Sequence, residues 1–361
     1  MGKKFAQSLT TTPTDPYRFF IVFGQHERVS GTRVRRRIAL ATLGLAVVFG
    51  LSGCAVDGAA PGSVASRPIP DAPGHTAPNE PAIAPAADVI PPDTVWESMV
   101  WVPAGDHRVP GTLALPAAQP GAPAPAQIPA VLLLHGDLGN RNETGDLFGR
   151  EAADLAADGI ASLRIDFAGS GDSTEPDLAL DYPNMVADAT ASVRYLQSDP
   201  RIDPTRIAVL GLSRGGSLAA TLAGTLPGMA ALVEWSGAVY NGYDEDPDAH
   251  QRAREDGFVP IDLGDRDVDL SLNWYDTIEQ SHPLDDVAGY QGPVLAVVGS
   301  DDQVVPPSVA DLFLAAVASR DTTLHTVAGA DHLFGAGSDD QTPANEALTV
   351  TTAWLGSRLA Q

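Results

Sequence analysis

Residues 206–217 read RIAVLGLSRGGS, and this stretch decides how the rest of the chain is interpreted. Its first five residues are mostly apolar and include two β-branched side chains, which is typical of a buried strand. The residues after Gly216 are small and compatible with a helix. The pattern Gly-x-Ser-x-Gly at 211–215 therefore predicts a tight strand-to-helix turn with Ser213 at its tip. We expect the backbone of Ser213 to be strained, with the positive end of the helix dipole beneath it.

Apolar runs typical of strands alternate with helical patterns on both sides of this turn. The run at 130–134 is continuously apolar, which indicates a central strand buried on both faces. Further strands are expected at 94–102, 111–115, 159–165, 229–235, 293–299 and 322–327, and helices at 144–157, 184–197, 308–319 and 342–359. This alternation predicts an α/β fold with a mostly parallel central sheet and helices on both faces.

The alternation stops at 236–290, which is acidic, aromatic and too long for a simple loop. We expect this segment to form a small inserted cap. The cap would belong to one folded domain that spans residues 94–361. Within it His250 and His282 could be solvated or lie near the substrate, and we expect them to be solvated.

The first 93 residues differ in composition from that domain. A basic stretch, Arg33–Arg37, precedes an apolar run at 38–51 and then Leu-Ser-Gly-Cys, as in a secretory signal. The apolar run is too short for a transmembrane helix, which needs about 20 residues. Leu-Ser-Gly-Cys resembles a bacterial lipobox, which implies lipidation of Cys54, the single cysteine of the chain. We therefore expect a signal peptide at 1–53 and an extracytoplasmic protein held at a bacterial cell membrane by an N-terminal lipid anchor.

Residues 54–93 are rich in proline and alanine and show no hydrophobic period, so they read as a linker. The charge of the chain is unevenly divided. Residues 1–53 hold eight of the 22 basic residues and two of the 46 acidic ones, which leaves 14 basic and 44 acidic residues in the remainder. An acidic body with few clustered cations excludes nucleic acid as an expected partner. No lysine follows Lys4, so a Ser–Lys catalytic dyad in the body is excluded as well.

Five short motifs follow one another along the body. They are His135-Gly136-x-x-Gly139, Ile165-Asp166-Phe167-x-Gly169-x-Gly171-Asp172-Ser173, Gly211-x-Ser213-x-Gly215-Gly216, Gly299-Ser300-Asp301-Asp302-x-Val304-Val305-Pro306 and Gly329-Ala330-Asp331-His332. With these motifs, the chain from about residue 94 onward resembles the α/β-hydrolase fold family. It is most similar to compact esterases of the feruloyl or cinnamoyl esterase and dienelactone-hydrolase-like kind.

The resemblance implies a serine hydrolase that cleaves a small-molecule carboxylic ester through an acyl-serine intermediate. Ser213 would be the nucleophile, His332 the base that takes its proton, and Asp302 the acid that orients the imidazole. The backbone N–H groups of Asp137 and Arg214 would form the oxyanion hole. No cofactor is implied, and we expect no metal site because neither His-Glu-x-x-His nor a Cys/His cluster occurs.

Several alternatives stay open on the sequence. Asp301 could replace Asp302 as the acid, although the spacing within the motif favours Asp302. The side chain of Arg214 could meet an acidic group of a substrate, and the carboxylate of Asp137 must turn away from the oxyanion. The same triad would serve a peptidase or a thioesterase. An alternative of another class is a non-catalytic binding lipoprotein that uses the fold to hold a ligand.

Overall fold

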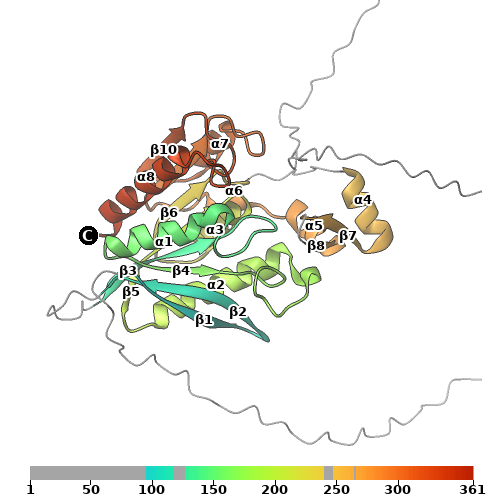
Figure 1. Ribbon diagram of the computed structural model, residues 1–361, viewed down its shortest axis with the longest axis horizontal. Coiled ribbons are helices and arrows are strands. Elements are labelled where there is room, and N and C mark those ends of the chain that lie inside the picture. The colour runs from blue at the N-terminus through green and yellow to red at the C-terminus, as the bar shows by residue number, and fades with distance from the viewer. Residues whose placement is uncertain (1–94, 118–126, 240–246, 264–265, 361) are drawn as a thin grey trace, which may run out of the picture. The chain divides into compact units, whose positions relative to one another are not determined.

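The computed structural model describes residues 95–117, 127–239, 247–263 and 266–360, which belong to the larger of two units into which the chain divides. The predicted signal peptide, Cys54 and the linker at 54–93 lie outside the described residues. The described residues all lie in the domain predicted at 94–361 (Figure 1).

The centre of the domain is an eight-stranded sheet with the strand order β1-β2-β4-β3-β5-β6-β9-β10. Its strands are β1 (Trp96–Ala104), β2 (His107–Leu115), β3 (Ile128–Leu134), β4 (Ala161–Ile165), β5 (Ile202–Leu212), β6 (Met229–Trp235), β9 (Val294–Gly299) and β10 (Thr322–Val327). Strands β1 and β2 pair antiparallel, β2 also pairs antiparallel with β4, and all other pairs are parallel. The predicted fold class, a mostly parallel sheet with helices on both faces, is confirmed.

The parallel strands bring the candidate site residues to one edge of the sheet. Strand β5 lies between β3 and β6, with Leu134 opposite Gly211 and Leu212 opposite Trp235. Their carboxyl ends therefore meet at the same edge, where the following loops begin. In open parallel sheets this edge is where ligands bind.

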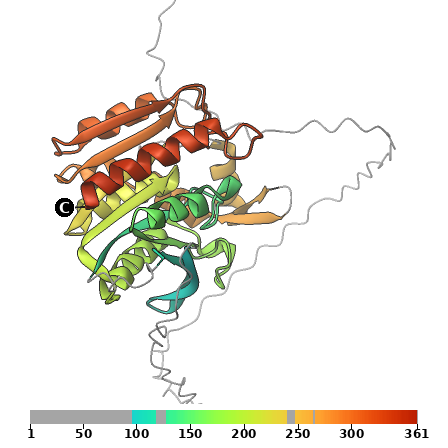
Figure 2. The ribbon, with the colours of Figure 1, turned by 60° about the vertical axis from the view of Figure 1, so that its left-hand side comes forward.

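Helices cover both faces of the sheet. They are α1 (Leu147–Ala157), α2 (Tyr182–Ser198), α3 (Arg214–Thr225), α7 (Ser308–Ala316) and α8 (Thr342–Leu359), with short 3-10 turns η1 (Thr144–Asp146) and η2 (Asp177–Ala179). Helices α1 and α8 pack with one core cluster that includes Phe148, Trp235 and Leu355, and Figure 2 shows α8, in red, lying over the strands. Helices α2, α3 and α7 supply the other cluster, which includes Met185, Leu218 and Phe313.

The segment between β6 and β9 forms elements outside the large sheet. They are α4 (Pro247–Asp256), β7 (Phe258–Asp262), β8 (Asp267–Ser271), α5 (Leu272–Glu279) and α6 (Pro283–Val287), with β7 and β8 paired as a separate antiparallel hairpin. We call this the inserted segment. It is fastened to the start of α2, because Asn273 Nδ2 donates to Asp181 Oδ2 at 2.6 Å and the Tyr182 N–H donates to Thr277 Oγ1 at 3.2 Å.

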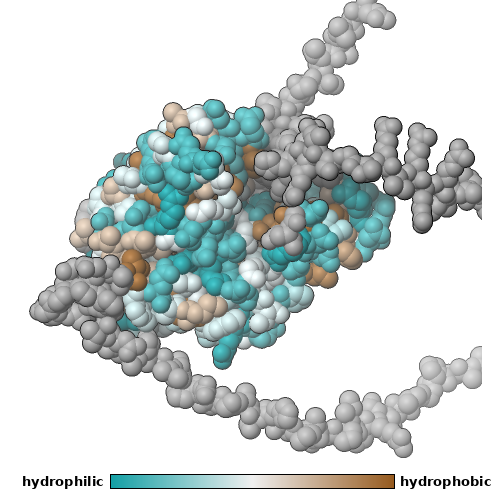
Figure 3. All heavy atoms as spheres, viewed as in Figure 1, coloured by the Kyte–Doolittle hydropathy of each residue, from teal (hydrophilic) through white to brown (hydrophobic). Residues whose placement is uncertain are grey.

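Polar side chains dominate the face of the domain seen in Figure 3, where hydrophobic residues appear only in small scattered groups. Within the described ranges, no helix is both long enough and apolar enough to cross a bilayer.

Candidate active site

Ser213 sits at the turn between β5 and α3 in a backbone conformation that L-residues rarely adopt. Its φ is 54° and its ψ is −117°, so the predicted strain is confirmed. The turn is held by backbone hydrogen bonds: the Ser213 N–H donates to the Trp235 carbonyl at 2.9 Å. The Ser213 carbonyl accepts from Gly216 and Ala238, each at 2.9 Å. The serine is thus fixed to β6 as well as to its own helix.

Glycine is required on both sides of Ser213 because backbone passes close by. A Cβ added at Gly211 would overlap the carbonyl of Gly215, and one added at Gly215 would overlap the carbonyl of Leu134. A Cβ at Gly216 would lie 2.7 Å from the Cα of Gly237. The sequence pattern therefore reflects the close packing of the β5–α3 turn against its neighbours.

Asp302 and His332 meet at the ends of β9 and β10. His332 Nδ1 lies 2.8 Å from Asp302 Oδ2, and the aspartate side chain is fully buried while that of the histidine is 13% exposed. Asp302 Oδ1 accepts the backbone N–H groups of Val304 and Val305 at 2.8 and 2.9 Å. Oδ1 of the carboxylate is thus bound to the backbone, and Oδ2 faces Nδ1 of the imidazole. The other ring nitrogen of His332, Nε2, lies on the side of the ring away from Asp302.

The rival acid, Asp301, is in a different environment. It is exposed and accepts a hydrogen bond from the neighbouring Ser300 Oγ at 3.0 Å. Asp331, next to His332, is also exposed and caps its own loop by accepting from Leu333 and Gly335. Only Asp302 among these three carboxylates contacts the imidazole in the described structure.

Four of the five predicted active-site residues form two side-chain pairs. Asp302 binds His332, and Asp137 binds Arg214, but no hydrogen bond between Ser213 Oγ and His332 is present in the described part of the chain. Catalytic hydrogen bonds are often long before substrate binds and tighten in the reacting complex.

The loop after β3 lies directly against the β5–α3 turn. A Cβ at Gly136 would lie 3.3 Å from the Cβ of Ser213, so the two backbones approach closely at a glycine. His135 shapes this loop: its Nε2 accepts the Phe167 N–H at 3.3 Å, and its Nδ1–H donates to the Gly136 carbonyl at 2.8 Å. Glu143 Oε1 accepts the Gly136 N–H at 2.6 Å. The next N–H along the loop, that of Asp137, donates to no group in the described residues.

The side chains of Asp137 and Arg214 form an ion pair. Arg214 Nε donates to Asp137 Oδ2 at 3.0 Å, and the arginine is 1% exposed while the Asp137 side chain is 25% exposed. Arg214 therefore pairs with an acidic group of the protein itself. The sequence drew attention to both side chains but did not reveal their pairing, since they are 77 positions apart.

A buried glutamate close to the β5–α3 turn, Glu234, was not predicted as a site residue. Glu234 lies in β6 opposite Gly211, is 1% exposed, and packs its Cγ toward Gly216. Burial raises the pKa of its carboxyl to about 8, against a smaller lowering by the N–H of Gly237. The signal that could have revealed it is the single charge in the otherwise apolar run at 229–235.

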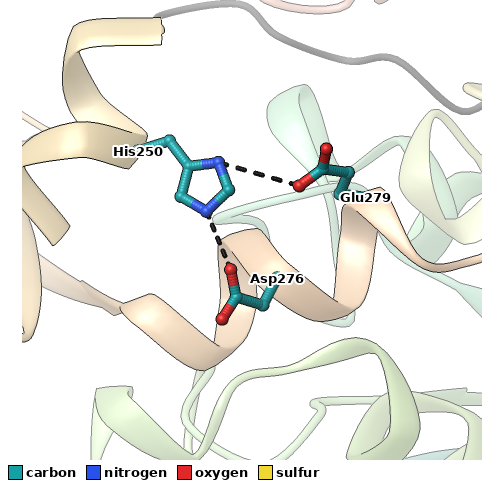
Figure 4. Close-up of side chains that lie close together, drawn as sticks. All are labelled: His250, Asp276 and Glu279. Carbon is teal, nitrogen blue, oxygen red and sulfur yellow. Dashed lines mark hydrogen bonds and ion pairs between the residues drawn. The ribbon is translucent and has the colours of Figure 1, made fainter. Parts of the chain in front are cut away.

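One group of potential metal ligands occurs in the described residues. The nearest ligand atoms of His250, Asp276 and Glu279 lie within 4.8 Å of one another. Figure 4 shows the imidazole between the two carboxylates, with one ring nitrogen toward each. Nε2 lies 2.9 Å from Asp276 Oδ1, whereas Nδ1 lies 4.0 Å from Glu279 Oε2 and 3.5 Å from the Arg254 guanidinium.

This arrangement is that of an ion-pair cluster joining α4 to α5, because the carboxylates occupy opposite edges of the ring and a cation already stands near Nδ1. The ring of His250 also stacks on Tyr275, with centroids 5.3 Å apart. Its side chain is 14% exposed, so it is only partly solvated.

Comparison with known proteins adds a family and a fold. Residues 148–360, more than half of the chain, match the sequence profile of the prolyl oligopeptidase family. An uncharacterized protein of Mycobacterium tuberculosis strain H37Rv is 28% identical over 191 residues, which are 53% of this chain and 58% of that protein. The candidate esterase NocK of Nocardia uniformis subsp. tsuyamanensis is 32% identical over 148 residues, which are 40% of this chain and 41% of NocK. The chain thus spans less than two thirds of the length of each of these relatives.

Among solved structures, Est1E from Butyrivibrio proteoclasticus with bound ferulic acid superposes with a TM-score of 0.58 at 20% identity. The match covers 73% of this chain and 100% of Est1E. This likeness shows the α/β-hydrolase fold and confirms the resemblance drawn from the five motifs.

Proposed function

Since the chain belongs to the prolyl oligopeptidase family, and is therefore a hydrolase of the α/β-hydrolase superfamily, we propose that it cleaves carboxylic esters through an acyl-serine intermediate on Ser213. The observation that carries the proposal is the buried Asp302–His332 pair, 2.8 Å between Oδ2 and Nδ1, at the sheet edge where Ser213 stands on a strained turn.

The chemistry follows from these groups. His332 removes the proton of Ser213 Oγ as that oxygen attacks the ester carbonyl carbon, and Asp302 stabilises the imidazolium that results. The carbonyl oxygen becomes an oxyanion, which the N–H groups of Asp137 and Arg214 stabilise. His332 then returns the proton to the leaving alcohol, and a water molecule, activated by the same histidine, releases the acid and regenerates Ser213.

A second candidate is peptidase activity on the same triad, and the match to the prolyl oligopeptidase family favours it. An amide and an ester pass through the same tetrahedral intermediate, so the difference lies in the pocket and in protonation of the leaving group. Thioesterase activity would also use this triad, and it has no observation of its own in its favour.

A substrate screen tests the proposal on the full chain. The panel is p-nitrophenyl esters from acetate to palmitate, methyl ferulate and amino-acid p-nitroanilides, each with Ser213→Ala alongside. We expect ester hydrolysis that the variant lacks, with the melting temperature nearly unchanged. Turnover of anilides alone would transfer the proposal to a peptidase. Activity retained by Ser213→Ala would refute the assignment of the nucleophile. If the wild type hydrolyses none of the substrates, the alternative of a non-catalytic binding protein is favoured.

A further inference from the structure

We infer that the Asp137–Arg214 ion pair positions the two backbone segments of the oxyanion site and cancels the charge of Asp137 beside the developing oxyanion. Both side chains are then positioning residues that act through their own backbone N–H groups. The inference rests on the proposed function, because an oxyanion forms only if Ser213 attacks a carbonyl carbon.

The pair joins the two segments at the place where they touch. Asp137 is on the loop after β3, whereas Arg214 is the first residue of α3 and follows Ser213 directly. The neighbouring contact is between Gly136 and Ser213, where a Cβ on the glycine would already lie 3.3 Å from that of the serine. No larger side chain can interlock the segments at that point, so the link must come from the next residues along.

The loop after β3 has unfavourable backbone angles that need external support. Leu138 has a φ of 60°, and Glu143 has a φ of 60° as well. The Gly136 N–H is tied to Glu143, which belongs to the same loop. Among the described side-chain hydrogen bonds of residues 135–143, the one between Asp137 and Arg214 is the bond that reaches α3. It therefore sets the distance between the N–H groups of the two segments.

The charges of the pair matter as much as its geometry. A lone carboxylate on Asp137 would repel an oxyanion held by the N–H of the same residue, and the guanidinium of Arg214 offsets that field. Both charges act on one buried point, the hydroxyl of Tyr182. Burial raises the pKa of Tyr182 to about 12, Arg214 lowers it and Asp137 raises it. Because Arg214 Nε lies 3.0 Å from Asp137 Oδ2, each charge offsets much of the field of the other.

Kinetics of three variants test the inference: Arg214→Met, Asp137→Asn and the double variant, on an ester that the wild type hydrolyses. Loss of an oxyanion-hole donor costs about 10²–10³ in kcat, so a displaced donor beside an unpaired carboxylate should cost about 10–100-fold in Arg214→Met. KM should change by less than about threefold, because the contact forms in the transition state. Asp137→Asn, which keeps the shape and an acceptor, should lose about three- to tenfold.

The double variant separates positioning from general damage. Removing the unpaired carboxylate should raise kcat above that of Arg214→Met, so the two losses should not multiply. Arg206→Met is the matched control, because Arg206 also pairs with an aspartate, Asp203, but near the opposite end of β5. It should lower the melting temperature and leave kcat unchanged.

The outcomes distinguish this inference from the proposed function. A wild type without Ser213-dependent turnover refutes the proposed function itself. Ser213-dependent turnover with Arg214→Met within twofold of wild-type kcat, or with losses that multiply in the double variant, overturns only the inference. If Arg214→Met does not fold, Asp137→Asn still decides, because its side chain is partly exposed and an unchanged kcat there is also contrary to the inference.

Discussion

At the scale of single residues, two adjacent carboxylates show how burial selects one role from two equal side chains. Asp302 is buried and accepts three hydrogen bonds, whereas Asp301 is exposed and accepts one from Ser300. We predict that Asp302→Asn lowers kcat by about 10⁴ on an ester substrate, because an asparagine cannot hold the imidazole in the required tautomer or stabilise the imidazolium. Asp301→Asn should change kcat by less than threefold.

Steady-state kinetics of the two purified variants check this prediction, with circular dichroism to establish that both are folded. Equal losses of kcat in the two variants would refute Asp302 as the acid that orients His332. A larger loss of kcat in Asp301→Asn would assign that role to Asp301.

Glu234 gives a prediction about pH. Its pKa in the folded protein is about 8, whereas an unfolded glutamate titrates near 4.5. Below pH 4.5 the carboxyl is protonated in both the folded and the unfolded state, so its ionisation does not lower the free energy of unfolding. As pH rises toward 8, the unfolded state releases its proton and the folded state cannot, so the free energy of unfolding falls by an amount on the order of 5 kcal/mol.

We predict that Glu234→Gln flattens this decline, since glutamine does not titrate. Urea denaturation at pH 5, 7 and 8.5 measures the difference in slope. Glu151, which is fully buried and has a pKa raised by desolvation, adds a decline of the same sign, so the variant should keep part of the slope. Identical slopes in wild type and variant would show that the Glu234 carboxyl is not protonated in the folded state near neutral pH.

These residues show which side-chain roles can be read from sequence. The motifs identified Asp302 and His332, whose pairing follows from the position of their loops at the ends of β9 and β10. The partner of Arg214 could not be deduced, because it depends on where a side chain turns at the contact between two loops. The pKa of Glu234 likewise depends on burial, which the residue type does not report.

At the scale of elements, the β5–α3 turn depends on glycines whose substitution has a definite steric cost. We predict that Gly215→Ala destabilises the protein by at least about 3 kcal/mol, because the added methyl group would overlap the Leu134 carbonyl, and backbone cannot move aside as a side chain can. Gly289→Ala is the control, since its added methyl group meets no atom within 4 Å. It should change stability by less than about 0.5 kcal/mol.

Chemical denaturation of both variants measures the two free energies of unfolding. A Gly215→Ala protein as stable as Gly289→Ala would mean that β3 and the β5–α3 turn are not packed as closely as the structure has them.

Elements with a clear period were the predictable ones. The strands at 229–235 and 322–327 and the helix at 342–359 have the predicted bounds. The helix expected at 144–157 is instead divided into η1 and α1, because the φ values of Gly145 and Asp146, 63° and 56°, lie outside the right-handed helical range. The hairpin β7–β8 was not predicted, since its strands are only five residues long and one proline and three aspartates interrupt their apolar residues.

At the scale of the whole molecule, the chain carries its opposite charges in separate regions. Residues 1–53 hold eight basic and two acidic residues, whereas the rest holds 14 basic and 44 acidic ones. This division is typical of a cationic signal segment preceding a secreted body. The proposal of a lipid anchor at Cys54 rests on the apolar run at 38–51 and on Leu-Ser-Gly-Cys, which resembles a lipobox. Two acyl chains bind a bilayer stably because each buried methylene contributes about 0.8 kcal/mol, whereas a single chain binds only reversibly.

We therefore predict that the full chain, produced in a bacterium that matures lipoproteins, incorporates an alkyne analogue of palmitate and that Cys54→Ser abolishes the label. Ser63→Ala, a small change nine residues further on, should label as the wild type does. Labelling is a sharper measure than fractionation, because an uncleaved apolar segment at 38–51 could retain the variant at the membrane without any acyl chain. Specific activity per folded molecule should be the same in all three proteins, since the residues proposed for catalysis lie between 137 and 332. A labelled Cys54→Ser protein would place the acyl group elsewhere, and an unlabelled wild type would mean that Leu-Ser-Gly-Cys is not processed as a lipobox.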